Sequence, residues 1–386
     1  MSRVAVSPRI LQWARGRVGK DVDQLRARFP RLEQWEAEEV RPTLKQLESY
    51  ARATRTPFGY FFLQEPPKEE LPIPHFRTHT TTTPGRPSPD LLETVQTMQR
   101  RQDWLREVLI EDGEAPVPFI GRARLDEPID AIAADIRNTL RLLEPNWAQA
   151  LPTWTAALQR LRDLLDAAGV IVVTNGVVGN NTHRKLNPTE FRGFVLVDEY
   201  APLVFVNGAD AKAAQMFTLA HECAHLWFGQ SAVFDLSELQ PANERIERAC
   251  NAVAAELLVP ATELRTEWDR ARLTDEPFDY LARTFKVSAI VAARRALDMQ
   301  LITRDEFFDF YHAHLAEVRR RADAKDNRGG DFYLTQNVRL GRRFSVAVIN
   351  AVEEGRLTYR EAYSLTGLWG QTFDKYVAEV KGARRL

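Results

Sequence analysis

The sequence predicts an α+β protein that is mostly helical and carries a small β-sheet. Helical periodicity extends over most of the chain and is clearest in residues 91–110 and 154–169. In residues 169–207 it gives way to three short apolar runs, GVIVVTN, FRGFVLVD and PLVFVN, which predict strands. A length of 386 residues and a hydrophobic content of 44% are sufficient for two or three domains with cores of their own.

Residues 1–64 predict a small bundle of short helices. Ser7 and Pro8 open the first helix, and Asp21 caps a second helix that stops at Pro30. Thr43 caps the segment LKQLESYARAT, and the short helical segment FGYFFL follows it. Short turns join these segments, as expected for neighbouring helices in a compact bundle.

Residues 65–92 are rich in proline and threonine, which predicts a linker or an extended arm. We interpret His75 and His79 in this segment as solvated loop residues, because nothing in the sequence fixes their geometry for a metal ion. A main domain is expected over residues 93–325, with a helix–turn–helix-like segment, PFDYLARTFKVSAIVAARRALDMQLIT, after its core. Residues 326–386 are expected to form a C-terminal helical region that could serve dimerisation or substrate docking.

The composition argues against several classes of protein. The formal net charge is −1, so the whole molecule is not a polycation and any basic patch must be local. The two cysteines, Cys223 and Cys250, indicate no disulfide framework and favour a reducing compartment. The first residues show no signal-peptide pattern, and no stretch approaches the ~20 apolar residues needed to cross a bilayer. We therefore expect a soluble cytoplasmic protein.

One predicted helix, AKAAQMFTLAHECAHLWF, carries chemistry as well as core residues. His221 and His225 lie four residues apart, hence on one face of the helix, so both imidazoles can reach one metal ion. Glu222 projects about 100° away, where a general base for a metal-bound water belongs. The alternatives are two satisfied core histidines or a purely structural metal site, and the latter leaves Glu222 without a role.

A catalytic zinc ion needs a third protein ligand and one open position. The next helix, ERIERACNAVAAELL, offers Glu244, Glu247 and Glu256. Glu247 is favoured because Asn251 follows one turn later on the same face, where its amide oxygen can accept the N–H of a ligating imidazole. Glu256 lies roughly half a turn around the helix from Glu247, so both carboxylates cannot face the metal.

The predicted strand FRGFVLVD is the candidate edge for an extended peptide substrate. Gly193 would permit close approach of a peptide backbone, and Arg192 could meet a carboxylate or a carbonyl. An ordinary strand inside a sheet is the alternative.

The segments HECAH and ERACNAVAAELLVP together resemble the ImmA/IrrE family of zinc metallopeptidases, over about residues 170–300. Val259 stands where that family usually has methionine. The resemblance implies a zincin-like helical core on which the sheet packs, with His221, His225 and Glu247 as ligands of one Zn²⁺ per chain. It also implies that Glu222 is the catalytic acid and base. Mn²⁺ is an alternative occupant, because His/His/Glu ligation is not exclusive to zinc.

The N-terminal segment QWEAEEVRPTLKQLESYARATRTPFGYFFL resembles the second half of an Xre-type helix–turn–helix domain. Only PRLEQ separates Phe29 from Trp35, so the recognition helix is shortened. It leaves Arg31 and Gln34 for base edges, beside glutamates that would repel phosphates. The resemblance implies DNA binding by residues 1–64, and a degenerate domain used for protein contacts is the alternative.

These features predict a zinc-dependent endopeptidase, and the resemblance implies that its substrate is a regulatory protein, typically a helix–turn–helix repressor. The alternative is a DNA-binding transcription regulator, or a toxin–antitoxin component, in which the peptidase fold acts as a sensor. A homodimer is compatible with either hypothesis, and no membrane partner is expected.

Overall fold

The computed structural model describes residues 3–69, 71, 75–76, 87–234, 245–322, 336 and 338–382. The chain divides into two compact units, one made of Met1–Pro72 with His79–Gln96 and the other of Ile73–Thr78 with Thr97–Leu386. The expected α+β class is confirmed, because helices dominate and the strands form a small mixed sheet. None of the helices in the described ranges combines the length and apolar character needed to cross a membrane.

The first unit contains a bundle of short helices. They are α1 (Pro8–Arg17), α2 (Val22–Arg26), α3 (Leu32–Glu36), α4 (Leu44–Ala53) and the 3-10 helix η1 (Phe58–Phe62). Asp21 and Thr43 each form a capping box at the start of α2 and α4, as their positions predict. Tyr50 lies at the centre of the core, where its ring packs edge-on against Phe29 and its hydroxyl donates to the carbonyl oxygen of Leu11 at 2.9 Å.

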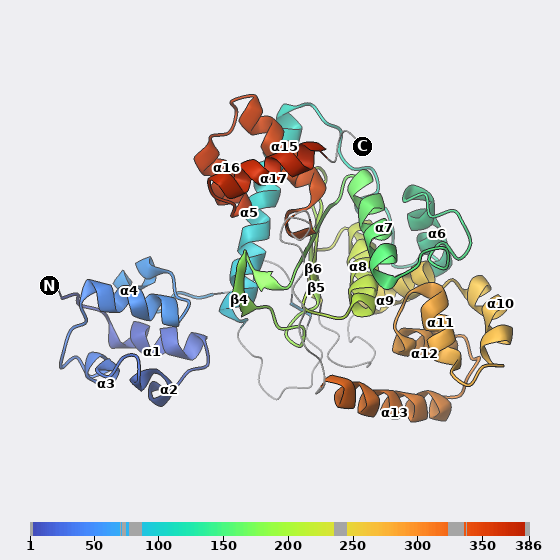
Figure 1. The fold of residues 1–386 in the computed structure, drawn as a ribbon, viewed down its shortest axis with the longest axis horizontal. Coiled ribbons are helices and arrows are strands. Elements are labelled where there is room, and N and C mark those ends of the chain that lie inside the picture. The colour runs from blue at the N-terminus through green and yellow to red at the C-terminus, as the bar shows by residue number, and fades with distance from the viewer. Residues whose placement is uncertain are drawn as a thin grey trace. The chain divides into compact units, whose positions relative to one another are not determined.

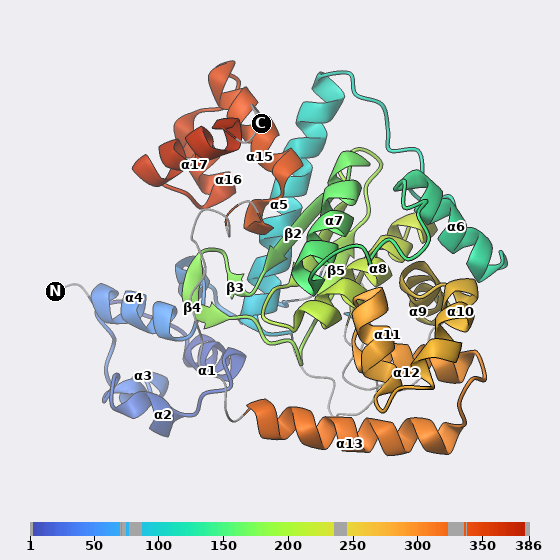
Figure 2. The same cartoon turned by 45° about the vertical axis from the view of Figure 1, so that its right-hand side comes forward.

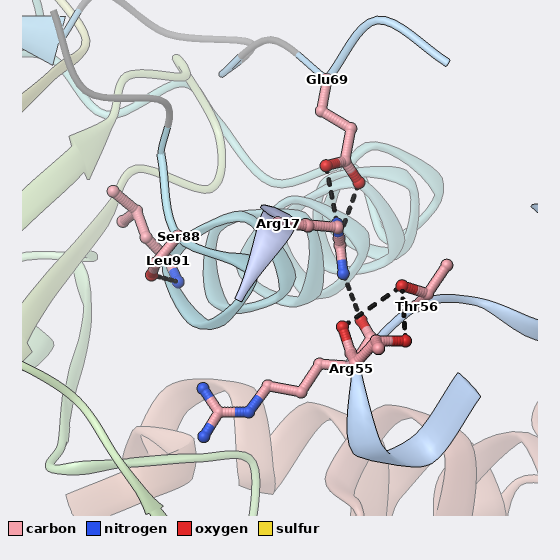
Figure 3. A network of polar contacts seen from close by, with 7 residues as sticks. Arg17, Arg55, Thr56, Glu69, Ser88 and Leu91 are labelled. Carbon is pink, nitrogen blue, oxygen red and sulfur yellow. Dashed lines mark hydrogen bonds and ion pairs between the residues drawn. The ribbon is translucent and has the colours of Figure 1, made fainter. Parts of the chain in front are cut away.

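Segments on both sides of the proline-rich stretch belong to this first unit. Glu69 forms a two-pronged ion pair with Arg17, with Nε–Oε2 and Nη2–Oε1 distances of 2.7 and 2.6 Å. Arg17 also donates to the carbonyl oxygen of Arg55, whose own guanidinium pairs with Asp90 (Figure 3 shows the first of these contacts). These ion pairs hold the chain on either side of residues 70–87 against the helical bundle.

The main sheet lies in the second unit and has the strand order β1-β7-β5-β6-β2. Its strands are β1 (His75–Phe76), β7 (Ala232–Phe234), β5 (Gly193–Leu196), β6 (Leu203–Asn207) and β2 (Ile171–Asn175). β5 runs antiparallel to both of its neighbours, whereas β2 is parallel to β6 and β1 is parallel to β7. A separate hairpin joins β3 (Val177–Val178) to β4 (Asn181–Lys185).

The sequence-based placement of Arg192 and Gly193 at an exposed sheet edge is therefore wrong. Gly193 pairs with Val206 of β6 on one side and with Phe234 of β7 on the other, so β5 has no free edge there. The error has a physical cause. Two very short strands, β7 and β1, extend the sheet beyond β5, and strands of two or three residues leave no periodic signal in a sequence.

Helices cover both faces of this sheet. On one face, α8 (Lys212–Phe228) packs against β5 and β6, and α7 (Trp154–Ala167) and α9 (Arg245–Leu258) pack against α8. α5 (Pro89–Glu111) runs along the opposite face, as Figures 1 and 2 show. Gln102 of α5 fixes this arrangement by donating to the carbonyl oxygens of Leu196 and Ala201, at 2.8 and 2.9 Å. α6 (Ile129–Thr139) packs against α9.

After α9 the described chain is again helical. The predicted helix–turn–helix segment forms α11 (Pro277–Phe285) and α12 (Ala289–Asp298), preceded by α10 (Ala261–Ala271) and followed by α13 (Arg304–Ala322). The C-terminal region contains α15 (Arg342–Glu353), α16 (Tyr359–Thr366) and α17 (Gln371–Gly382). The backbone N–H of Arg343 donates to Asp166 at 3.0 Å, and Arg101 donates to the carbonyl oxygen of Leu365 at 2.9 Å.

Candidate metal centre

α8 is a buried helix that carries polar side chains in its interior as well as apolar ones. From Gln215 to Phe228 every residue of the helix is buried, because the sheet covers one side of it and α7 and α9 cover others. Gly229 ends the helix in the left-handed conformation, with φ of 69°, as its position predicts. His221, Glu222 and His225 are each 0% exposed, so their polar atoms must find partners inside the protein or in a bound group.

Three side chains converge between α8 and α9. The Nε2 atoms of His221 and His225 lie 3.1 Å apart, and the Glu247 carboxylate oxygens lie 3.2 and 3.0 Å from them. One ligand atom from each of the three residues lies within 4.8 Å of the others, and all three residues are buried. The structure thus brings together the two histidines of one helix and the carboxylate that the sequence favoured as a third ligand.

This donor set fits a divalent transition metal. Two imidazole nitrogens and one carboxylate are the ligands of a common class of catalytic zinc site, in which a fourth position stays open for water. Two neutral imidazoles whose Nε2 atoms lie 3.1 Å apart can form at most one N–H···N hydrogen bond, whereas a metal ion between them satisfies both lone pairs. The chemistry of the donors therefore fits Zn²⁺, and Mn²⁺ remains compatible with it.

Asn251 orients the first of these histidines. The Oδ1 atom of Asn251 lies 3.0 Å from Nδ1 of His221, one turn along α9 from Glu247. If this ring nitrogen carries the proton and donates it to the amide oxygen, the lone pair of Nε2 is left facing Glu247 and His225. This is the contact that the sequence suggested for Asn251.

Burial and neighbouring charges determine how the acidic groups of the centre ionise. Burial would raise the pKa of the Glu247 carboxyl, but the imidazoles of His221 and His225 beside it outweigh burial and lower the pKa to about 2. Burial lowers the pKa of His221, although Glu247 opposes that change. Glu247 is therefore a carboxylate at neutral pH and His221 is neutral, and these are the forms that bind a metal ion.

Glu222 lies beside the centre in a different environment. Burial, reinforced by the charge of Glu247, raises its pKa well above the usual range. Neither of its carboxylate oxygens has a hydrogen-bond partner among the described residues, and the Oγ1 atom of Thr218, one turn earlier, is also unpartnered. We did not identify Thr218 from the sequence. Its i, i+4 spacing to Glu222 was the signal that could have indicated it.

The other candidate ligands have other roles or lie elsewhere. Glu256 forms an ion pair with Arg295 of α12, which also donates to the carbonyl oxygen of Val259 at 3.1 Å, so Glu256 is occupied in holding α12. Glu244 lies outside the described residues. Arg192 forms an ion pair with Asp210 at 3.2 Å, so it is not a free cation for a substrate carboxylate.

The remaining residues selected from the sequence lie outside this group of ligands. Cys223 and Cys250 are free and buried, and burial raises the pKa of both thiols, so both have the character of packing residues.

In the first unit, Gln34 on α3 and Arg31 just before it are exposed. α3 has only five residues, and a DNA contact through Arg31 and Gln34 stays a prediction.

Comparison with known protein families agrees with this geometry. Residues 166–297 match the IrrE N-terminal-like domain, and this segment contains all three converging ligands, Glu222 and Asn251. The ImmA/IrrE family consists of zinc metallopeptidases, which supports a peptidase role for this part of the chain. Residues 340–379, which include α15 and α16, match a domain of unknown function, DUF8813. The curated proteins include no significant match to the chain.

Proposed function

We propose that the second unit is a zinc-dependent endopeptidase in which Glu222 is the catalytic acid and base. The observation that carries this proposal is the convergence of His221, His225 and Glu247 within 4.8 Å, with an unpartnered buried glutamate adjacent to one of them in the chain. A structural metal site would need only the ligands, whereas a buried glutamate without partners has a high energetic cost that a catalytic role explains.

In this proposal the chain provides three metal ligands, a carboxyl group that can carry a proton, and apolar surroundings that exclude bulk water. A bound zinc ion would polarise the scissile carbonyl and lower the pKa of the attacking water. Glu222 would act as the acid and base of the reaction, taking up a proton from the attacking water and later giving it to the leaving amine. Asn251 holds the ring of His221 in one orientation throughout. The apolar residues of α8 and α9 exclude bulk water and so strengthen these interactions.

For the substrate we propose a regulatory protein, and specifically a helix–turn–helix repressor. The resemblance of residues 170–300 to the ImmA/IrrE peptidases supports this substrate class. Our alternative hypothesis is a regulator that uses the peptidase fold as a sensor. It is favoured by the exposed Arg31 and Gln34 in the unit that resembles a helix–turn–helix domain.

Replacement of Glu222 by Gln tests the enzyme hypothesis. The amide cannot take up a proton, so we expect stoichiometric metal in the purified variant, by elemental analysis, but loss of cleavage. Comparison of the proteomes of cells that carry the wild type or Glu222→Gln should reveal a protein that is cut only with the wild type. Glu199→Gln, at an exposed position, is the matched control and should leave that cleavage unchanged.

The same variant separates the two hypotheses. If Glu222→Gln preserves the biological phenotype and no protein differs between the proteomes, the peptidase proposal is wrong and the regulator is favoured. A gel shift with DNA from upstream of the gene then tests the first unit, because binding through phosphates must weaken as the salt concentration rises. The elemental analysis also distinguishes Zn²⁺ from Mn²⁺.

A further inference from the structure

Gly193, the first residue of β5, lies directly against α8, the helix that carries His221 and His225. A Cβ atom at this position would lie 2.6 Å from Cγ2 of Thr218 and 3.1 Å from Oε1 of Glu222. It would also lie 2.8 Å from the carbonyl oxygen of Phe205 in the neighbouring strand. Real Cβ atoms essentially never approach other atoms to less than 3.0 Å, so this position has room for a hydrogen atom alone.

The atoms around Gly193 differ in how easily they can move. The Phe205 oxygen is part of the paired backbone of β6, and Thr218 is a β-branched side chain whose χ1 angle is restricted on a helix. The Glu222 carboxylate is the end of a longer side chain and is the easiest of the three to displace. A side chain at residue 193 must therefore push α8 away from the sheet, move the Glu222 carboxylate, or do both.

Thr218 and Glu222 are held in place by packing rather than by hydrogen bonds. They lie one turn apart on α8, are 1% and 0% exposed, and have three side-chain oxygen atoms without a partner among the described residues. The close approach of β5 at Gly193 is thus one of the contacts that determine where the Glu222 carboxylate lies.

We propose that Gly193 is a positioning residue for Glu222, because the absence of a side chain there allows the carboxylate to lie between α8 and β5 beside the metal ligands. The consequence for catalysis rests on the peptidase function proposed above, whereas the steric relation between Gly193, Thr218 and Glu222 does not. The φ angle of Gly193 lies outside the left-handed region, so alanine can adopt this backbone and a substitution tests the steric contacts of the new Cβ without backbone strain.

Gly193→Ala and two double variants test the contact. Thr218→Ser removes the methyl group that the new Cβ would strike, whereas Thr218→Val keeps a branched side chain and removes the hydroxyl. We expect Gly193→Ala to weaken Zn²⁺ binding about tenfold, measured by competition with a chromogenic chelator, and to lower the unfolding temperature of the second unit. Adding Thr218→Ser should restore part of both properties, because the close contact with the Phe205 oxygen remains, and adding Thr218→Val should restore neither.

Gly176→Ala is the matched control. A Cβ at Gly176 would be similarly crowded, at 2.8 Å from the backbone nitrogen of Ala209, but it touches neither Thr218 nor Glu222. This control should lower the unfolding temperature and leave Zn²⁺ binding within about twofold of the wild type. Equal effects of Gly193→Ala and Gly176→Ala on Zn²⁺ binding, or equal rescue by the two Thr218 substitutions, would overturn the proposal. If Gly193→Ala alone is insoluble, the two double variants are compared by solubility. A soluble double variant with Thr218→Ser beside an insoluble one with Thr218→Val supports the proposal, and equal solubility overturns it.

A double-mutant cycle between Gly193→Ala and Glu222→Gln tests the link to Glu222. We expect the two effects on the unfolding equilibrium to depart from additivity by about threefold or more, because one substitution moves the group that the other changes. Additive effects would overturn the proposal whether or not a substrate is found. Once a cleaved protein is known, Gly193→Ala should lower kcat more than it raises KM. The absence of any cleaved protein would count against the peptidase function, and not against the steric relation.

Discussion

At the scale of single residues, the centre depends on groups that orient the ligands as much as on the ligands. The ring of His221 is held by Asn251 at 3.0 Å, and Glu247 lies on the same helix one turn earlier. α9 thus provides both a ligand and the group that orients a ligand of α8. A shift of α9 would move the Glu247 carboxylate and also the amide that orients the His221 ring. Two of the three proposed ligands therefore depend on how α9 packs on α8.

Asn251 provides a direct test of that orientation. Asn251→Ala removes the acceptor of the His221 N–H, and we expect the dissociation constant for Zn²⁺ to rise about 10- to 100-fold. Asn251→Asp keeps an oxygen acceptor in place and should remain closer to the wild type. Competition with a chromogenic chelator measures both variants. Unchanged Zn²⁺ binding in Asn251→Ala would show that the contact does not support the metal site.

Some residues of the candidate metal centre could be selected from the sequence alone, and others could not. His221, Glu222 and His225 could be selected because their relative positions depend only on the geometry of one helix. The choice among Glu244, Glu247 and Glu256 depended on how a second helix packs, which spacing alone does not determine. The i, i+4 spacing of Thr218 to Glu222 was visible in the sequence, but the close approach of Gly193 to both could not be identified, because it depends on the distance between α8 and β5.

At the scale of secondary structure, elements with a visible periodicity or a capping residue could be predicted, whereas the shortest strands could not. The three apolar strands and the helices α5, α7, α8 and α9 have lengths over which periodicity is visible. β1 and β7 have two and three residues, and pairing with neighbours is what makes them strands. For this reason β5 could be taken from the sequence as a candidate edge strand, although the structure shows the alternative, a strand in the middle of the sheet.

The ion pair between Arg17 and Glu69 joins α1 to a segment far along the chain in the first unit (Figure 3). The two side chains are only 6% and 9% exposed. Replacing Glu69 by Gln leaves a buried guanidinium without its counter-charge, so we expect a loss of about 3–5 kcal/mol in the free energy of unfolding of this unit. Hydrogen exchange of the amides in α1 and α4 of the full chain measures that loss.

A second ion pair on the same helix supplies the control. Arg9 and Glu65 lie 3.1 Å apart but are 72% and 75% exposed, so water screens their attraction. Glu65→Gln should therefore cost only about 0–1 kcal/mol. If both glutamate substitutions change the exchange of α1 equally, burial does not distinguish the two pairs and the expectation for Glu69 is wrong.

At the scale of the whole molecule, the metal centre belongs to one of the two units. All three ligands come from α8 and α9, which lie in the second unit, and the first unit supplies none of them. Free energy from metal binding should therefore stabilise the second unit selectively. The two units then need not unfold together, and a single unfolding temperature would not describe the chain.

Removal and return of Zn²⁺ tests this separation. A ligand that binds only the folded state at about 100 times its dissociation constant adds about 2.7 kcal/mol to the free energy of unfolding. We expect Zn²⁺ added to the metal-free protein to slow hydrogen exchange in α8 and α9 by a corresponding factor of about 100, and to leave α1 and α4 unchanged. In Glu247→Ala, which lacks one ligand, most of the slowing should disappear. Equal slowing in both units would show that their stabilities are coupled, and no slowing in either would mean that the convergent side chains do not bind the ion.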